Sequence, residues 1–461
     1  MQPSATHLLP LLNRLGLASP PDGEVEITGR DPMLACRFPV SEIAAGVLAG
    51  IGIAVNDLWE IRTGRRQNLR VDVRHTAASL RSAHLQVLNG KVVERPPSPD
   101  IVFSNFYQCG DGRWIHLHGT FPHLAAKTAA LLGCTRDRTS ISASVARWNS
   151  VNLEDSLAEI GVCGAVARSA AEWAVHPQGG SLLSVPPVEV IKIAESAPEP
   201  LLPGKRPLTG IRALDLTRVL AGPIASRVLA EHDADVMTVS SPNLPTIVPF
   251  VMETNHGKLS TYLDLDNSAD FQQLRQLILQ SDVFIHGYRT GSLERRGLSP
   301  DELAMLRPGL IYVSINCYGS VGPWQSRRGW EQLGQTVTGL AVAQGEPNPP
   351  QIMPAQVCDY TTGYLAALGI LIALGRRVRE GGTYHVRASL SQTGMWIERA
   401  GAICDPDKAT GFGDVDDLRI ATESPFGRLH HLRPVLDMSE TPPFWSRPSV
   451  PLGTHPPIWP A

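Results

Sequence analysis

Aromatic side chains are scarce in this 461-residue chain, and neither sign of charge predominates. Aromatic residues make up 6%, and 41 Lys and Arg stand against 44 Asp and Glu, for a formal net charge of −3. Nucleic-acid binding usually needs a basic face, and binding of single strands also needs aromatic stacking platforms. The composition therefore predicts no nucleic-acid partner. Apolar residues reach 43%, which suffices for buried cores and argues against disorder.

Closely spaced cysteine ligands and long apolar runs are also lacking. The seven cysteines are scattered, with no CxxC or Cys/His pair, which predicts reduced thiols without a disulfide framework or a structural metal site. His116 and His118 alternate on a predicted strand, but no third ligand accompanies them, so a structural role is favoured. The apolar run 363–375 ends at Arg376, short of the ~20 residues that a bilayer core demands. With no signal peptide at the N-terminus, these absences predict a cytoplasmic protein without membrane contact.

Strands and helices alternate regularly in the second half, after a Pro- and Glu-rich linker at residues 195–209. The apolar stretch 211–216 predicts a buried strand, the spacing over 224–232 predicts a helix, and 235–240 predicts a second strand. The same rhythm continues along the chain. This alternation predicts an α/β fold in which residues 210–400 form an open, parallel, doubly wound (Rossmann-like) sheet with helices on both faces.

The remaining segments have less regular patterns. Residues 101–194 mix helical and strand signals and predict a smaller α+β domain. Residues 401–461 are rich in Pro and weak in periodicity. We therefore expect an extended tail over the surface or over a partner subunit, with His430 and His431 in solvent.

A short repeat links residues 1–100 to the second half. Residues 40–55 read VSEIAAGVLAGIGIAV and residues 357–372 read VCDYTTGYLAALGILI, with an acidic residue third in each, Glu42 and Asp359. Both stretches run through a basic, glycine-containing turn into a predicted strand. Two apolar helices can match this well by chance. The pattern favours an internal repeat, with the first copy a partial and degenerate version of the larger domain.

Five ordered segments of the second half resemble the family III CoA-transferases, the CaiB/BaiF class. They begin at Ala213 (ALDLTRVLAGP), Asn255 (NHGKLSTYLDL), Ser281 (SDVFIHGYRTGSLERRGL), Pro308 (PGLIYVSINCYGSVGPW) and Val357 (VCDYTTGYLAALGIL). Five segments in order are far more specific than one short motif. The resemblance implies a transferase that moves CoA between an acyl-CoA and a small carboxylic acid, with CoA as substrate and no tightly bound cofactor.

The first half resembles the opposite end of the same family's chain. Residues 38–80 are similar to the stretch around the family's nucleophile, and residues 105–180 to the small domain that follows it. The chain therefore looks like a late half joined to an early half, in reversed order. Members of the family form interlocked homodimers, so the resemblance implies an oligomer, although one rearranged chain could supply both halves.

Asp359 matches the family's nucleophilic aspartate. A carboxylate that attacks the thioester forms a mixed anhydride, CoA thiolate converts this into an enzyme-bound thioester, and an incoming acid collects the CoA. Asp359 also directly precedes a helix expected to start near Tyr360, where backbone N–H groups favour an anion. By position alone, a plain helix cap would explain it. Glu42 is one methylene longer, which would misplace its carboxylate, so we expect no catalysis in the first copy.

The resemblance also implies CoA contacts at Val219, Ala221, Gly222, Lys258 and Arg289. The first three would touch CoA through backbone and small side chains in the loop after the first strand. The two basic residues would bind its phosphates. The alternatives are an ordinary turn and solvated surface charges. No GxGxxG motif follows the first strand, which argues against NAD.

Two other functions also fit the residues. A CoA-binding or scaffold protein without turnover fits the degenerate first copy and the Thr-Val-Ser at 238–240, where the family usually has Lys-Val-Glu. An acyl-CoA racemase or isomerase fits the same fold, but such enzymes carry Gly-His-Asp where this chain has Gly-Trp-Glu at 329–331. Trp330 cannot shuttle a proton, and racemisation needs two bases. Trp330 is expected to line the acyl pocket or to lie in the core.

Overall fold

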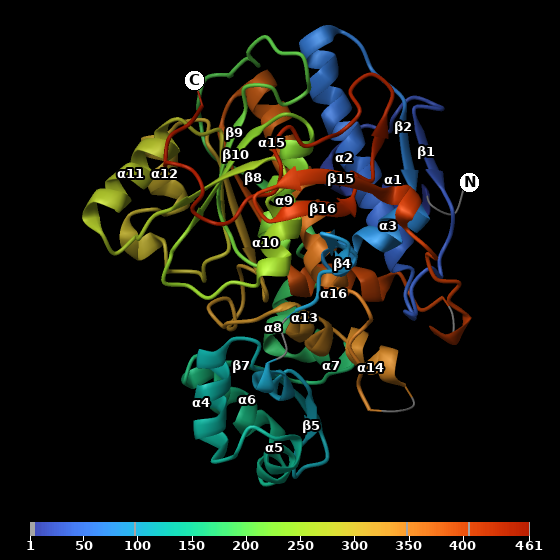
Figure 1. Cartoon of the computed structure of the whole chain (residues 1–461), viewed down its shortest axis with the longest axis vertical. Helices are drawn as coiled ribbons and strands as arrows, with labels where there is room; N and C mark the ends of the chain where they lie inside the picture. The colour runs from blue at the N-terminus through green and yellow to red at the C-terminus, as the bar shows by residue number, and fades with distance from the viewer. Residues whose placement is uncertain (1–4, 96–97, 347–348, 404–405, 461) are drawn as a thin grey trace.

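A seven-stranded sheet forms the centre of the molecule (Figure 1). The structure is a computed structural model that describes residues 5–95, 98–346, 349–403 and 406–460. From edge to edge the strands are β11 (Lys258–Tyr262), β10 (Asp235–Ser240), β9 (Arg212–Leu216), β12 (Val283–His286), β13 (Ile311–Asn316), β14 (Thr383–Ser389) and β8 (Val188–Ala194). Every neighbouring pair is parallel except β14 and β8. The predicted α/β class and doubly wound sheet are confirmed.

The antiparallel edge strand β8 corrects a predicted boundary. Its residues pair with β14, with Val188 opposite Ala388 and Ala194 opposite Thr383. The smaller domain therefore does not extend to residue 194, because the chain has entered the large sheet by residue 188. Pairing of an edge strand with a distant segment leaves no local sequence signal, which is why the boundary was placed too late.

Helices cover both faces of the sheet. On one face, Leu214, Phe284 and Tyr312 pack in a core cluster with α11 (Ser268–Leu279) and α12 (Pro300–Leu306). The opposite face contributes to the main core beside α9 (Ala221–Glu231) and α15 (Val357–Glu380). Figure 1 shows α11 and α12 on one side of the strands and α15 on the other. The helices α10 (Val248–Thr254), α13 (Glu331–Val337), α14 (Leu340–Gly345) and α16 (Leu390–Arg399) complete this unit.

Both stretches of the sequence repeat form long helices. Helix α2 (Val40–Thr63) and helix α15 each have 24 residues, with Glu42 and Asp359 third in their respective helices. Each is followed by a strand and a short helix: β2 (Leu69–Asp72) and α3 (Val73–Ser79), or β14 and α16. The two long helices pack together, and a Cβ added at Gly50 would lie 3.2 Å from Leu368. By length and composition both could cross a bilayer, but 89% and 94% of their apolar windows are buried in protein.

The C-terminal segment has more regular structure than its composition predicts. Strands β15 (Arg419–Ser424) and β16 (Gly427–Leu432) form a hairpin that continues into β3 (Val87–Leu88) and β4 (Lys91–Val92). Strand β17 (Asp437–Met438) pairs with β2, whose other neighbour is β1 (Val25–Thr28). Helix α1 (Ala5–Leu15) packs on α2. The segment 401–461 thus completes sheets begun in the first half, instead of remaining extended throughout.

The end of this segment runs along the large sheet. The backbone N–H of Ser260 donates to His455 Nδ1 at 3.1 Å, and the Trp459 indole donates to the Leu277 carbonyl at 3.2 Å. His431 was expected in solvent and is instead buried, with its ring 3.8 Å from that of His256. A polar residue on the inward face of a strand is buried by the sheet pairing, which composition alone does not indicate.

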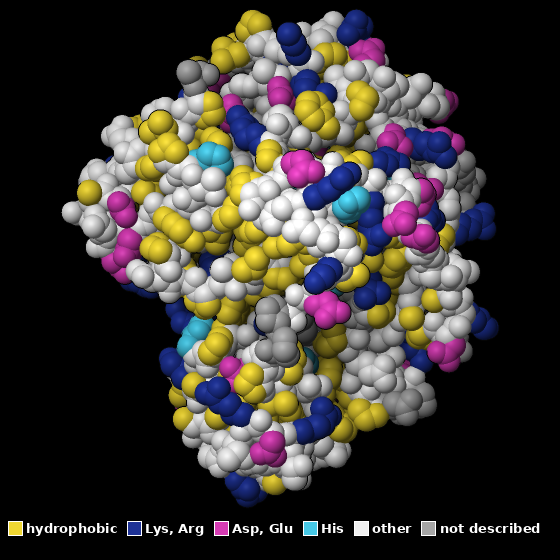
Figure 2. Space-filling view, viewed as in Figure 1, with side chains coloured by type: hydrophobic (Ala, Val, Ile, Leu, Met, Phe, Trp, Pro, Cys, Tyr) yellow, Lys and Arg dark blue, Asp and Glu magenta, His cyan; other side chains and the backbone are white. Residues whose placement is uncertain are grey.

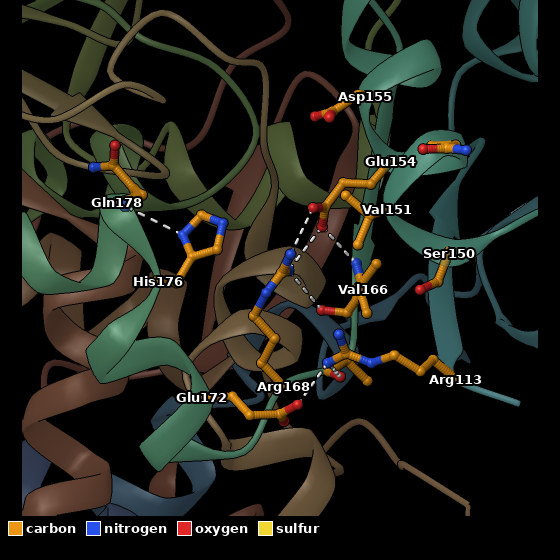
Figure 3. A network of polar contacts seen from close by, with 12 residues as sticks. Arg113, Ser150, Val151, Glu154, Asp155, Val166, Arg168, Glu172, His176 and Gln178 are labelled. Atoms are coloured by element: carbon orange, nitrogen blue, oxygen red, sulfur yellow. Dashed lines mark hydrogen bonds and ion pairs between the residues drawn. The ribbon is translucent and has the colours of Figure 1, made fainter. Parts of the chain in front are cut away.

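The smaller lobe hangs below the main body in Figure 1. Its three strands are β5 (Phe106–Gln108), β6 (Trp114–His118) and β7 (Cys163–Val166), and its helices are α4 (Pro122–Leu132), α5 (Arg138–Val145) and α6 (Ser150–Glu159). Figure 3 shows how Arg168 is bound by Glu154, with two buried contacts of 2.7 and 2.6 Å. Helices α7 (Ala170–Val175) and α8 (Pro177–Leu182) then lead back to β8.

Charges of both signs are mixed on the surface. On the face shown in Figure 2, Lys and Arg side chains are interspersed with Asp and Glu. Apolar side chains are frequent on the same face where the main body meets the lower lobe. A binding site with an apolar lining is therefore expected at the junction between the lobes.

Candidate functional site

An open cavity of about 430 Å³ lies at the carboxyl ends of β9, β12 and β13. The strand order reverses between β9 and β12, and ligands of open α/β sheets bind at such a reversal. The large sheet contributes the loops 216–222, 287–292 and 315–317, and α15 contributes Asp359. The small lobe closes one side with Phe121, His123, Leu124 and Cys163.

Asp359 lies in the first turn of α15 and lines this cavity. The helix begins at Val357, earlier than expected, so Asp359 is not its cap residue. The side chain is 9% exposed, and within the described residues no hydrogen bond reaches its carboxylate. Burial, followed by the nearby charge of Glu331, raises the pKa of Asp359 well above its usual value. An unpartnered carboxylate at a cavity wall is available to react with a bound electrophile.

Glu331, the first residue of α13, holds the start of α15 in place. Its Oε1 accepts hydrogen bonds from the backbone N–H of Cys358 at 3.1 Å and from Gln335 Nε2 at 2.8 Å. Its Oε2 is buried without a partner among the described residues. Burial raises the pKa of Glu331 to about 7. The sequence indicated no role for Glu331 beyond its place in the Gly-Trp-Glu stretch, because only the fold brings residue 331 beside residue 358.

The loop between β9 and α9 forms another wall of the cavity and contributes Val219, Ala221 and Gly222 to it, whose contacts with CoA stay a prediction. Val219 has a φ of 74°, a conformation that is costly for a β-branched residue and is maintained by the surrounding contacts. A Cβ at Gly222 would lie 2.3 Å from Thr217, so only glycine fits there. A Cβ at Gly363 would lie 2.6 Å from the Ala221 carbonyl, so glycine also lets α15 approach this loop. The two helix N-termini therefore converge on one cavity.

Lys258 does not line the cavity and is fully buried beneath the loop. Its Nζ lies 3.2 Å from Asp215 Oδ2, 2.8 Å from the Pro223 carbonyl and 2.7 Å from Ser226 Oγ. Asp215 in turn accepts a hydrogen bond of 2.9 Å from the Thr217 backbone N–H. Burial lowers the pKa of Lys258 to about 8. The expected phosphate contact is thus corrected: all three ammonium donors already have partners, and Lys258 supports the loop from below.

Arginines surround the opening of the cavity. Arg289, in the loop after β12, lines it together with Arg218, Arg327 and Arg328, and its expected contact with a CoA phosphate stays a prediction. Arg327 pairs with Asp155 at 2.6 Å. In the described parts of the chain, neither Arg289 nor Arg328 forms a salt bridge, and burial together with the charge of Arg328 lowers the pKa of Arg289. Two unpaired, mutually repelling guanidinium groups would be stabilised by a phosphate.

Around Asp359 the cavity wall is apolar and contains thiols. Trp330 lines it, with its ring 5.3 Å from that of Phe121 and 5.5 Å from that of His118. Cys317 donates to the Trp330 carbonyl at 3.7 Å. His118 is buried behind the indole, and both of its ring nitrogens lack partners in the described structure. Trp330 thus lies in the pocket wall, one of the two places expected for it.

The corresponding position in the first copy lies outside this cavity. Glu42 Oε1 accepts a hydrogen bond of 3.0 Å from the Asp31 backbone N–H, and Asp31 Oδ2 accepts from the Glu42 N–H at 2.9 Å. The Glu42 carboxylate is therefore already hydrogen-bonded to the backbone at the start of α2. Its expected lack of catalysis stays a prediction.

Across the described residues, no group of three or more His, Cys, Asp or Glu could hold a metal ion. His116 and His118 are both buried in the small lobe, and burial lowers the pKa of each. Of the cysteines, Cys404 lies outside the described residues.

Comparison with known proteins identifies the family of this site. A family model described as CoA-transferase family III matches residues 17–183 and 208–409, most of the chain. The chain belongs to CoA-transferase family III. The two matched stretches are separated by the Pro-rich linker region. The resemblance of the five segments to this family is confirmed, and so is the expectation of a transferase.

Curated relatives carry similar names. This family III CoA-transferase is 32% identical over 451 residues to acetyl-coenzyme A transferase nodX of Hypoxylon pulicicidum, covering 87% of this chain and 74% of that protein. It is 32% identical over 397 residues to an acyl-CoA transferase of Gibberella moniliformis, covering 77% and 69%. A succinate–glutarate CoA-transferase of Agrobacterium fabrum is 33% identical over 40% of this chain and 51% of its own.

Solved structures match smaller parts of the CoA-transferase. The hypothetical protein Rv3272 of Mycobacterium tuberculosis matches at 31% identity and a TM-score of 0.40, over 44% of this chain and 57% of that one. A CaiB/BaiF family protein from Brucella suis matches at 25% identity and a TM-score of 0.40, over 49% and 65%. The chain thus spans less than two thirds of each of these structures.

Proposed function

We propose that this enzyme transfers CoA from an acyl-CoA to a carboxylic acid, with Asp359 as the covalent acceptor. The observation that carries the proposal is the Asp359 carboxylate, which lines the cavity without a hydrogen-bond partner among the described residues. The unpaired guanidinium groups of Arg289 and Arg328 lie in the same cavity, where the phosphates of CoA would neutralise them. Among the described residues that line the cavity, Asp359 is the one acidic side chain, and it lies in the first turn of a helix.

The proposed reaction begins when an Asp359 oxygen attacks the thioester carbonyl carbon. The C–S bond breaks, CoA leaves as a thiolate, and a mixed anhydride joins the acyl group to Asp359. The thiolate then attacks the aspartyl carbonyl carbon, which releases the first acid as its carboxylate and leaves an aspartyl-CoA thioester. The acceptor carboxylate attacks this thioester to form a second anhydride. Attack of the thiolate on the acceptor's carbonyl carbon releases the new acyl-CoA and restores the Asp359 carboxylate.

Several contacts support these steps. Asp359 lies in the first turn of α15, and the positive end of the helix dipole would stabilise negative charge there. Glu331, through its hydrogen bond to the Cys358 N–H, maintains the position of this turn. Its like charge raises the pKa of Asp359. A carboxylate of raised pKa is more basic, and basicity favours attack on the thioester when the group is ionised.

The test traps the covalent intermediate. The full chain is incubated with an acyl-CoA and then with hydroxylamine or borohydride, and peptides are analysed by mass spectrometry. We expect a hydroxamate or an alcohol at Asp359, and none in Asp359→Asn, whose amide cannot attack. Met305→Ala, at a residue 76% exposed on α12, is the matched control and should be labelled normally. CoA binding without label or exchange would show a binding protein, and solvent deuterium at the α-carbon without CoA exchange would show a racemase.

A further inference from the structure

The loop 317–330, between β13 and α13, forms much of one wall of the cavity. A Cβ added at Gly329 would lie 2.4 Å from the Cys317 sulfur, so the two ends of the loop are in close contact. After residue 324 the loop contributes to the cavity lining Gln325, Arg327, Arg328, Gly329 and Trp330. The conformation of the loop between its two ends therefore decides where these side chains lie.

Gln178, the second residue of α8, fills the inside of this loop. Its Nε2 donates to the carbonyls of Tyr318 and Val321, at 2.7 Å each, and its Oε1 accepts from the Trp324 backbone N–H at 2.6 Å. The side chain is 0% exposed. Figure 3 shows that Gln178 is itself held by His176, whose Nδ1 accepts the Gln178 backbone N–H at 3.1 Å. One amide thus satisfies three peptide groups of the turn 318–324.

The turn encloses this amide closely. Gly322 has a φ of 85°, in the left-handed region that favours glycine. A Cβ added there would lie 2.6 Å from Gln178 Oε1, so a larger residue would push the amide away from the turn. The backbone of the turn and the Gln178 side chain therefore fit together only as a unit.

Trp324 connects this turn to the arginines of the cavity. The guanidinium carbon of Arg327 lies 4.2 Å from the centre of the Trp324 ring, within the range of a cation–π interaction. His176 packs edge-on against the same ring, with the ring centres 4.6 Å apart. Because Gln178 holds the Trp324 backbone, a continuous series of contacts leads from Gln178 to Arg327 and to the next residue, Arg328.

We propose that Gln178 is a positioning residue for acyl-CoA binding, which holds the turn 318–324 so that Arg328 stays at the cavity. This inference rests on the proposed function, in which Arg328 binds a phosphate of CoA. Gln178 does not itself line the cavity, so it acts on the substrate only through the loop. Loss of its hydrogen bonds frees the loop, whereas Asp359 keeps its place on α15. KM for acyl-CoA should therefore rise while kcat changes little.

Gln178→Met in the full chain tests this role, because Met has nearly the same length but cannot form the three hydrogen bonds. We expect KM for acyl-CoA to rise at least about tenfold, since a charge-assisted contact to phosphate is lost. Gln86→Met is the matched control. Gln86 is also 0% exposed, and its Nε2 donates to the carbonyls of Ala83 at 3.0 Å and Pro249 at 2.8 Å, outside the loop. This control should retain the original KM.

The division between KM and kcat distinguishes positioning from a structural role alone. A purely structural role would lower the amount of active enzyme, and so the apparent kcat, with constant KM, and that result in Gln178→Met overturns the proposal. Gln178→Glu is the second variant, for use if Gln178→Met does not fold. Its carboxylate can still accept from the Trp324 N–H but, when ionised, has no proton for the two carbonyls. The same rise in KM is expected.

A double-mutant cycle identifies the route of the effect. If Gln178 acts through Arg328, Arg328→Ala should raise KM by less than about threefold in the Gln178→Met protein, because the phosphate contact is already lost. Increases in KM that multiply independently overturn the proposal. Label at Asp359 is measured in parallel: its absence from the original enzyme counts against the proposed function. Label at Asp359 with an unchanged KM in both Gln178 variants counts against this inference alone.

Discussion

The Glu331 side chain accepts a hydrogen bond of 3.1 Å from the backbone N–H of Cys358, the residue immediately before Asp359. The contact joins the start of α13 to the start of α15, and it brings two carboxyl groups into one buried place. Glu331 thereby has two effects on Asp359. It fixes the turn that carries the side chain, and its charge makes the Asp359 carboxyl harder to ionise. The two effects can be separated by a substitution that keeps the acceptor oxygen and removes the charge.

Glu331→Gln is expected to shift the acidic limb of the pH–rate profile to lower pH. The amide oxygen can still accept from Cys358, but the neutral side chain no longer raises the pKa of Asp359. Since the ionised form of Asp359 attacks, kcat/KM should rise at a lower pH in the variant. The measurement is kcat/KM against pH with one acyl donor. An acidic limb that does not move would mean that the Glu331 charge does not act on the reacting group.

The same substitution should change the pH dependence of stability. Folding raises the pKa of Glu331 from 4.5 to about 7, so the folded state holds this proton more tightly than the unfolded state does. The resulting stabilisation is full below pH 4.5 and is lost as the pH rises to about 7, by up to about 3 kcal/mol. Glu331→Gln removes this loss. Urea unfolding from pH 4.5 to 8 should therefore show a flatter curve for the variant, and parallel curves would contradict the burial effect.

Lys258→Met is expected to destabilise the protein by about 3–5 kcal/mol, because it leaves the Asp215 carboxylate buried without its cation. The loop residue Thr217 is bound to the same carboxylate, so KM for acyl-CoA should also rise. Urea unfolding gives the free energy, and steady-state kinetics gives KM. The double variant Lys258→Met, Asp215→Asn removes both charges and should recover much of the stability. Direct phosphate binding by Lys258 would instead weaken CoA binding without loss of stability.

Arg289→Ala and Arg328→Ala are each expected to raise KM for acyl-CoA by roughly ten- to hundredfold with little change in kcat, because a charge-assisted contact to phosphate contributes roughly 1.5–3 kcal/mol. The difference in KM between each variant and the original enzyme should become smaller at high salt, because salt screens the attraction between arginine and phosphate in the original enzyme. Arg70→Ala is the matched control: this exposed residue lies on β2 and pairs with Glu26. A large fall in kcat with constant KM would place these arginines in the chemical step instead of in CoA binding.

Much of the large sheet was predictable because its signals are local. Apolar residues recur with the period of a strand or of a helix in three consecutive segments, 211–216, 224–232 and 235–240. The structure has β9, α9 and β10 at these places. The sequence also placed Asp359 at the start of a helix. In the structure this helix begins at Val357, two residues before Asp359. The segment 401–461 was less predictable, since its strands β16 and β17 pair with residues more than three hundred positions away.

The sequence by itself determined the fold class, the family and the acidic residue at the start of α15, because periodicity and ordered motifs are properties of neighbouring residues. Only the tertiary structure decided which charges face the cavity. In the sequence, Lys258 and Arg289 are both basic residues beside predicted elements of the sheet, and nothing local distinguishes them. In the structure Lys258 is fully buried against Asp215, whereas Arg289 is exposed at the cavity. Glu331 reaches Cys358 only because α13 and α15 pack together. Whether a charged side chain can bind a ligand depends on its existing partners and on its exposure to solvent. Both are set by contacts between residues that are distant in the chain.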